Sequence, residues 1–216
     1  MSQPPESTEP ADPSTTDEFE SALAPRIVPS TARWVDAALS DLSTLLVDHA
    51  HCERKAAQTA LQFVQQRPTD PALCAALSRL AREELVHFER VLGEMKSRGI
   101  AMRSLPSAGY AGRLFELVRK DHRDLDAFLV CALIEARSHE RFVRLAQSTS
   151  DARLSAFYTD LGTAEERHGA FYVGLAQSAA SDEEKRLLSR RLDELTAAEA
   201  EIVHRPNQPI RMHAGG

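Results

Sequence analysis

A duplicated spacing of glutamates and histidines constrains this chain more than any other feature. In each half of the sequence a single Glu is followed by the run Glu-x-x-His, after 31 residues in the first half and 30 in the second. Equivalent positions of the two halves are 81 or 82 residues apart. The residues concerned are Glu53, Glu84, His87, Glu135, Glu165 and His168.

The sequence around these residues is typical of helices. Only nine glycines occur in 216 residues, and no stretch alternates polar and apolar residues as a half-buried strand does. Prolines, glycines and capping residues divide the chain into segments. We expect one or two helices over 31–66, further helices over 70–98, 109–121, 124–148, 151–179 and 182–204, and an irregular stretch over 99–108. This pattern predicts an all-α protein.

The six residues fall on apolar helix faces. Residues three or four apart share one face of a helix, and in the segment 70–98 this places Leu77, Leu80 and Ala81 in line with Glu84 and His87. The other three segments show the same pattern. The alternative is that each Glu lies on a solvated face, but two matching units make that a poor explanation.

Buried carboxylates need a compensating cation. An isolated buried carboxylate costs several kcal/mol or takes up a proton, and four of them would repel one another. Two divalent iron ions supply four positive charges for the four carboxylates, and oxygen ligands with a few imidazoles suit iron or manganese. The donor set matches the metal site of ferritin-like four-helix bundles, in which two helices give one Glu and two give Glu-x-x-His. We therefore expect such a bundle, with additional helices and with no catalytic residues beyond the metal ligands.

Four polar residues lie close to these ligands in the sequence. Asp48 and Asp160 each precede a predicted ligand by five residues and either orient a histidine or lie on the surface. His49 and His139 lie one helical turn from Glu53 and Glu135. We expect these two histidines to be polar residues at the edge of the site rather than hydrogen-bond donors to ligands.

The N-terminal segment differs from the rest in composition. Residues 1–29 hold six of the eleven prolines, and six acids against one base. Such a segment buries too little apolar surface to become ordered, so we predict a disordered acidic tail over 1–29 and one domain over 30–216. The overall charge of −6 therefore lies mostly in the tail. The absence of a long apolar run, a secretory signal and a cysteine framework indicates a cytoplasmic protein without a membrane span.

Longer stretches extend the pattern beyond the ligands. The runs LLVDHAHCERKAAQTA (45–60), LAREELVHFERV (80–91), IEARSHERF (134–142), EERH (165–168) and RMHAG (211–215) together resemble the tRNA 2-methylthio-N6-isopentenyladenosine hydroxylase family. The likeness extends over nearly all of the chain after the acidic tail.

This resemblance implies a non-haem di-iron monooxygenase. It would hydroxylate the isopentenyl side chain of a modified adenosine beside the tRNA anticodon, with O2 as co-substrate and electrons from an external reductase. The six residues of the duplicated pattern would hold the two irons. We expect a monomer or a weak dimer.

A basic segment joins the two halves of the pattern. Residues 96–123 carry seven basic and two acidic residues, and basic side chains bind nucleic-acid phosphates. We expect this segment to lie near the mouth of the active-site pocket, where Arg113, Arg119, Lys120 and Arg123 would bind tRNA. The alternative is that these basic residues lie on a solvated helix face and do not bind RNA.

Other functions share part of this pattern. A ferritin-like protein for iron oxidation and storage is one alternative, although such sites usually lack the second Glu-x-x-His. Another di-iron oxidase is a second alternative, and a rubrerythrin-like peroxidase would carry C-x-x-C pairs that this chain lacks.

Overall fold

The computed structural model of the protein describes residues 27–215. Residues 1–26 of the predicted acidic tail, together with Gly216, lie outside the described residues. Ile27, within the same predicted tail, is only 4% exposed and packs into the core. Among the described residues, core contacts thus include a residue three positions before the predicted domain boundary at residue 30.

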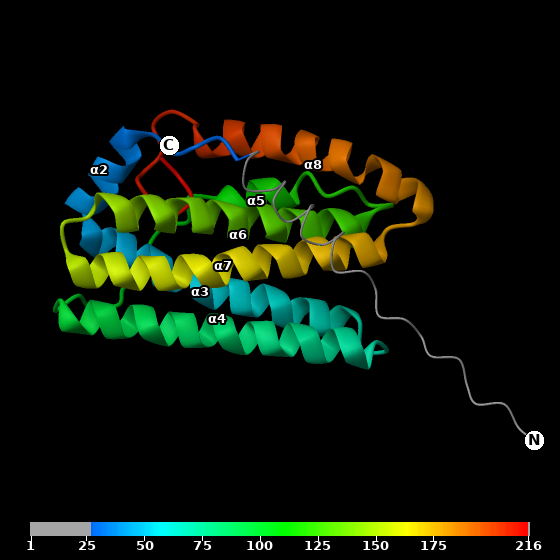
Figure 1. The fold of residues 1–216 in the computed structure, drawn as a ribbon, viewed down its shortest axis with the longest axis horizontal. Helices are drawn as coiled ribbons and strands as arrows, with labels where there is room; N and C mark the ends of the chain where they lie inside the picture. The colour runs from blue at the N-terminus through cyan, green and yellow to red at the C-terminus, as the bar shows by residue number, and fades with distance from the viewer. Residues whose placement is uncertain (1–26, 216) are drawn as a thin grey trace, which may run out of the picture.

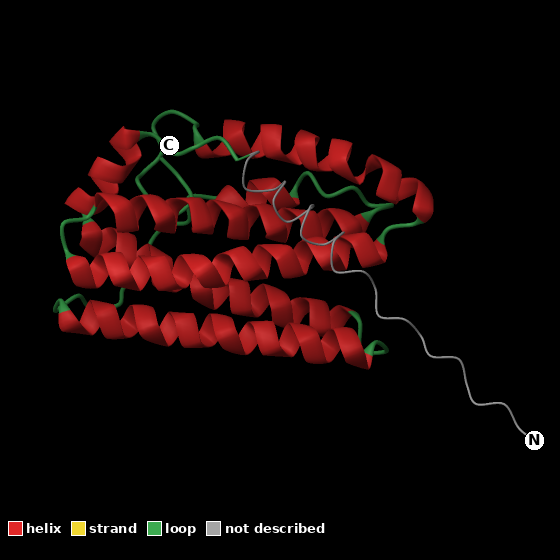
Figure 2. Ribbon diagram, in the orientation of Figure 1, coloured by secondary structure: helices red, strands yellow, loops and turns green. Residues whose placement is uncertain are grey.

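All regular secondary structure in the described part of the chain is helical (Figure 2). An isolated bridge pairs Arg211 with Ala214, outside any strand. The prediction of an all-α, ferritin-like four-helix bundle with additional helices is confirmed. The helices are α2 (Ala32–Ser40), α3 (Leu42–Gln66), α4 (Pro71–Ser97), α5 (Tyr110–Phe115), α6 (Arg123–Ser148), α7 (Ala152–Ala179) and α8 (Asp182–Val203).

Two helical hairpins form the bundle. Short connections join α3 to α4 and α6 to α7, and the helices of each hairpin pack closely along their lengths. As Figure 1 shows, α3 and α7 run in one direction and α4 and α6 in the other. The long connection between the hairpins contains α5, while α8 packs against α5 and α6. No helix among residues 27–215 is long and apolar enough to span a membrane.

Side-chain caps fix where most helices begin. Free backbone N–H groups in the first turn need acceptors, and a Ser, Thr or Asp side chain provides one at the start of α2, α3, α4, α7 and α8. The last of these is a full capping box, in which Glu184 also accepts from the backbone N–H of the cap residue. The capping residues are Thr31, Asp41, Asp70, Asp151 and Ser181.

Of the two alternatives predicted for 31–66 the structure has two helices, and the helix predicted over 109–121 is shorter than expected. The segment 31–66 forms two helices because Asp41 leaves the helical conformation and caps α3. The helix predicted over 109–121 ends at Phe115. It stops early because the Asp126 carboxylate accepts hydrogen bonds from the backbone N, Nε and a terminal nitrogen of Arg119, at 3.0, 2.9 and 2.8 Å, which holds the chain in a turn.

Apolar side chains fill the bundle in two clusters, one toward each end. The middle turn of every bundle helix lies between these clusters, and that is where the duplicated Glu and His residues occur. The bundle helices contribute Phe63, Leu77, Phe128 and Val173 to one cluster, and Leu46, Val91, Phe142 and Leu161 to the other.

The segment after α8 folds back over the bundle. The indole Nε1 of Trp34 donates hydrogen bonds to the carbonyl oxygens of Arg211 and Ala214, both at 3.1 Å. The guanidinium of Arg141 lies 4.1 Å from the Trp34 ring centre and donates to the carbonyl of Met212 at 2.5 Å. These contacts hold residues 211–214 beside α2 and α6.

Candidate metal centre

The six residues of the duplicated pattern lie in the interior at the middle of the bundle. Each hairpin contributes one Glu from its first helix and a Glu-x-x-His from its second. Every one of the six is at most 5% exposed, so none lies on a solvated face. In order along the chain they are Glu53 on α3, Glu84 and His87 on α4, Glu135 on α6, and Glu165 and His168 on α7.

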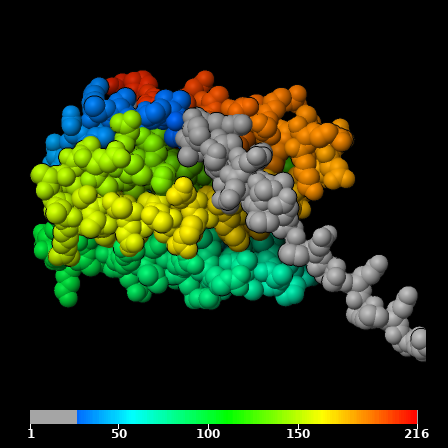
Figure 3. All heavy atoms as spheres, viewed as in Figure 1, coloured from blue at the N-terminus to red at the C-terminus, as the bar shows by residue number. Residues whose placement is uncertain are grey.

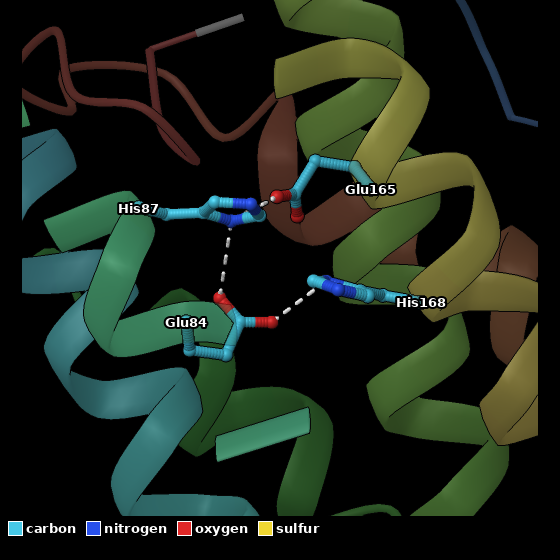
Figure 4. Close-up of side chains that lie close together, drawn as sticks. All are labelled: Glu84, His87, Glu165 and His168. Atoms are coloured by element: carbon cyan, nitrogen blue, oxygen red, sulfur yellow. Dashed lines mark ion pairs between the residues drawn. The ribbon is translucent and has the colours of Figure 1, made fainter. Parts of the chain in front are cut away.

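Four of these side chains form the centre of the cluster (Figure 4). One ligand atom from each of Glu84, His87, Glu165 and His168 lies within 4.8 Å of the others. The Nδ1 atom of His168 is 2.8 Å from Glu84 Oε1, and the Nδ1 atom of His87 is 3.4 Å from Glu165 Oε1 and 3.8 Å from Glu84 Oε2. The two Glu-x-x-His motifs therefore face each other across the bundle.

The two remaining glutamates flank this centre. Glu53 Oε2 lies 3.5 Å from His87 Nδ1. Glu135 is buried on α6, where burial first, and then the charges of Glu165 and Glu84, raise the pKa of its carboxyl well above the usual range. The sequence pattern thus placed all six residues in one buried region.

The donor atoms are not satisfied by the protein alone. Both oxygens of Glu84, Oε1 of Glu165 and Nδ1 of each histidine are buried without a hydrogen-bond partner among the described residues. Several of these atoms are close enough in distance to form ion pairs, but they are not aligned as hydrogen bonds. Buried polar groups rarely remain unpaired, and atoms that point toward one shared space are suited to a cation. The residues present fit a metal site.

Protons compensate for part of the charge in the protein without metal. Burial, and then the charge of Glu165, raise the pKa of Glu84 to about 8. Burial alone would lower the pKa of His87, but the nearby carboxylates of Glu165 and Glu53 raise it to about 10. Burial would also lower the pKa of His168, but the interaction with the Glu84 carboxylate is stronger and raises this pKa to about 9.

His49 supports the cluster directly, contrary to our expectation. Its ring is fully buried, and Nε2 lies 2.7 Å from Glu53 Oε1. This hydrogen bond lowers the pKa of Glu53 despite its burial. The spacing of four residues on one helix was the available signal, since it puts the two side chains on the same face. His139, by contrast, bonds the carbonyl of Gly162 at 2.8 Å.

Neither predicted orienting aspartate contacts a ligand histidine. Asp48 accepts a hydrogen bond from the backbone N–H of Met212 at 2.8 Å and so anchors the segment after α8. Asp160 is exposed and pairs with Arg90 at 2.5 Å. Glu83, which the sequence analysis did not single out, bonds His168 Nε2 at 3.1 Å instead.

A cavity of about 300 Å³ reaches the cluster from one side. Its walls come from α3, the connection around α5, α6, α7 and the segment 211–213. Glu135 lies on the wall, next to Ile134 and Tyr172, so the metal centre borders a largely apolar space. The basic segment that joins the two hairpins was expected near the mouth of the pocket, and its residues 107–112 do line the cavity.

Two cavity residues were not predicted from the sequence. The rings of Tyr110 and His213 stack with their centres 5.0 Å apart. Ser138 Oγ lies 2.9 Å from His213 Nε2, and burial lowers the pKa of His213 well below its usual range. A neutral imidazole stacked on a phenol ring therefore forms part of the wall.

The four predicted phosphate-binding residues are divided by their contacts. Arg113 donates to the carbonyl of Ala108 at 2.5 Å, and Arg119 is bound to Asp126. Lys120 and Arg123 are exposed and form no ion pair with other described residues. Of the four, only Lys120 and Arg123 are therefore free of contacts with other described residues that would compete with a phosphate. Phosphate binding by any of the four stays a prediction.

Comparisons with known proteins agree with this architecture. Residues 23–214 match the family described as tRNA-(MS[2]IO[6]A)-hydroxylase (MiaE). A Pseudomonas putida protein named tRNA 2-(methylsulfanyl)-N(6)-isopentenyladenosine(37) hydroxylase is 41% identical over 189 residues, covering 87% of this chain and 90% of the relative. A Salmonella typhimurium protein of the same name is 30% identical over 239 residues, covering 87% and 86%.

A solved structure adds a second line of comparison. It is described as protein 43 with aldehyde deformylating oxygenase activity, from Synechococcus. It is 42% identical to this chain, with a TM-score of 0.82, and the match covers 87% of this chain and 94% of the other. These findings confirm the resemblance deduced from the sequence runs.

Metal binding should strengthen as the pH rises from 6 to 9. His87, His168 and Glu84 bind protons below their raised pKa values, and a cation must displace these protons to use the same atoms. The apparent affinity for Mn²⁺ should increase by up to about tenfold per pH unit for each proton displaced. Titration calorimetry in buffers of different ionisation enthalpy measures both affinity and proton release. An affinity independent of pH would contradict this assignment.

Proposed function

The chain belongs to the tRNA-(MS[2]IO[6]A)-hydroxylase (MiaE) family, and on this premise we propose that it hydroxylates the isopentenyl side chain of 2-methylthio-N6-isopentenyladenosine in tRNA. It is a di-iron monooxygenase of ferritin-like fold. The observation that carries the proposal is the buried cluster of unsatisfied Glu and His donor atoms beside an apolar cavity.

Two iron ions are the cofactor that the donor set supports. Glu53, Glu84, His87, Glu135, Glu165 and His168 would hold them, four carboxylates balancing four positive charges. When bound, the irons supply the redox chemistry that activates O2. His49 fixes the carboxylate of Glu53 through its hydrogen bond, and Glu83 fixes the ring of His168. Such supporting contacts set the orientation of ligands.

The cavity suits the apolar part of the substrate. An isopentenyl group is a small branched hydrocarbon, and Ala56, Phe115 and Ile134 give the cavity wall a matching apolar surface. The wall reaches Glu135, so a hydrocarbon held there would lie next to the metal centre. The Tyr110 and His213 rings offer a flat surface against which an adenine base can stack.

The reaction requires two external electrons. One oxygen atom of O2 enters a C–H bond of the prenyl group, and the other leaves as water after taking up two electrons and two protons. Four buried carboxylates and two imidazoles provide no reducing equivalents, so a reductase must supply the electrons. Burial of the cluster keeps bulk water away from the reacting carbon.

Aldehyde deformylation is the second candidate activity. The observation that favours it is the 42% identity to the Synechococcus structure described with that activity. An apolar cavity beside a metal centre would accept an aliphatic aldehyde as well as a prenyl group. Iron oxidation and storage is a third candidate activity, but it would not require a cavity large enough for an organic substrate.

Product analysis distinguishes these activities. Protein loaded with ferrous iron, reduced and supplied with O2 and prenylated tRNA should yield a nucleoside heavier by one oxygen atom, as measured by mass spectrometry. Glu84→Ala and Glu165→Ala should lose iron and product, whereas the exposed neighbours Glu89→Ala and Glu166→Ala should retain both. Conversion of a linear aldehyde without any tRNA product would reject the proposed substrate.

Filling the cavity should impair substrate use without removing the metal. Ala56→Phe adds a ring to the cavity wall and takes up space that the prenyl group would occupy. The value of kcat/KM for prenylated tRNA should therefore fall roughly tenfold or more, which corresponds to about 1.4 kcal/mol or more. Ala75→Phe, on the exposed side of α4, is the control. Unchanged kinetics with full iron content in Ala56→Phe would place the prenyl group elsewhere.

Lys120 and Arg123, the two exposed basic residues without an ion pair among the described residues, should contribute electrostatically to tRNA binding. Each of Lys120→Ala and Arg123→Ala should weaken binding and reduce the slope of log Kd against log salt by about 1, as loss of one phosphate contact does. Lys185→Ala, an exposed residue on α8, should have no effect. Fluorescence anisotropy over a salt series measures these slopes, and equal slopes in all variants would move the RNA surface away from this segment.

A further inference from the structure

A shallow surface depression lies on the side of the metal centre that the cavity does not reach. It lies between α4 and α7, which run next to each other on the face shown in Figure 3. Its volume is about 450 Å³. Its lining consists of Arg79, Arg82, Glu83, Val86, His87, Arg90 and Arg167.

The depression meets both predicted histidine ligands. His87 forms part of its floor, with 7% of the side chain exposed. Glu83 lines the depression and bonds Nε2 of His168 at 3.1 Å. A molecule seated here would therefore touch the imidazole of His87 and be separated from that of His168 by one side chain, Glu83. The substrate cavity, in contrast, approaches the cluster at Glu135.

The charge around this depression is strongly positive. Four guanidinium groups line it against one carboxylate, and that carboxylate is already shared with His168 and with Arg167 at 3.9 Å. Arg90 pairs with Asp160. Arg79 forms no ion pair with other described residues, and Arg82 bonds only the hydroxyl of Ser78 there, at 3.3 Å.

Exposed apolar residues accompany these charges. Val86, on the lining, is 52% exposed, and the adjacent Leu85 is 41% exposed. An apolar centre with arginines around it is typical of protein interfaces. A nucleic-acid surface would need the phosphate-binding arginines but not exposed aliphatic side chains. The combination favours a protein partner with negative charge.

We propose that the depression between α4 and α7 is the docking surface for a small acidic iron–sulfur protein that reduces the metal centre. This inference rests on the proposed function, which needs two electrons per O2. Each docking event oxidises the carrier by one electron and reduces the metal centre by one. Two reduced carriers therefore serve one hydroxylation, with two protons from solvent. Electrons enter at the histidine side, and the substrate occupies the Glu135 side.

Charge reversal at the rim tests the surface, with a reduced plant-type [2Fe–2S] ferredoxin as the probe. Arg79→Glu with Arg82→Glu, and separately Val86→Asp, should weaken ferredoxin binding by about tenfold or more at low salt, since each reverses or removes part of the complementarity. The matched control reverses two exposed arginines of α8, Arg186→Glu with Arg190→Glu, and should bind as the wild type does. Circular dichroism checks that every variant is folded.

Reduction rates give a second readout. Under anaerobic stopped flow, ferredoxin should reduce the oxidised, iron-loaded variants at least about tenfold more slowly than the wild type, because less of the complex forms. Dithionite, which needs no docking, should reduce all of them at equal rates. Prenylated tRNA should bind the variants and the wild type equally.

Three results would overturn the docking proposal. The first is a wild type that binds no ferredoxin, and the second is a set of variants that bind and accept electrons as the wild type does. The third is a loss of tRNA affinity in the variants while ferredoxin reduction is unchanged. The last result would assign the surface to RNA. Failure of the proposed function is separate, because it appears as missing tRNA product in the dithionite-driven wild type while ferredoxin binding is unaffected.

Discussion

Burial of six ionisable side chains in one layer of the bundle is the constraint on which the rest of this structure depends. Removing charged groups from water costs several kcal/mol each unless partners replace the lost hydration. The apolar clusters on either side of the layer leave each carboxylate at most 4% exposed. Protons and imidazole–carboxylate contacts compensate partly, and the unsatisfied oxygens of Glu84 leave a requirement that a cation meets.

Local sequence was sufficient to place the ligands because their arrangement depends on helix geometry. A spacing of three residues puts Glu84 and His87 on one face in any helix, and the apolar residues around them determine which face is buried. The length of α5 was not predictable in this way. It depends on Asp126, a residue seven positions beyond Arg119, whose buried carboxylate holds the chain in a turn.

The surroundings of the site required three-dimensional information. His49 was expected at the edge because histidine is polar, but its ring packs against Phe142 and Tyr158 on the other hairpin, with ring centres 4.7 and 5.7 Å away. The stacked pair of Tyr110 and His213 joins positions more than 100 residues apart. Neither contact follows from periodicity, which describes one helix and not the neighbours that a helix acquires in the fold.

The division into two hairpins has a consequence for how the protein assembles. Each hairpin forms through contacts between segments close in sequence, which form early because little chain entropy is lost. The predicted metal ligands, however, are split equally between the hairpins, and the layer is completed only when both meet. The complete set of donors exists only when both hairpins are docked, so metal uptake at this site would require the full tertiary structure.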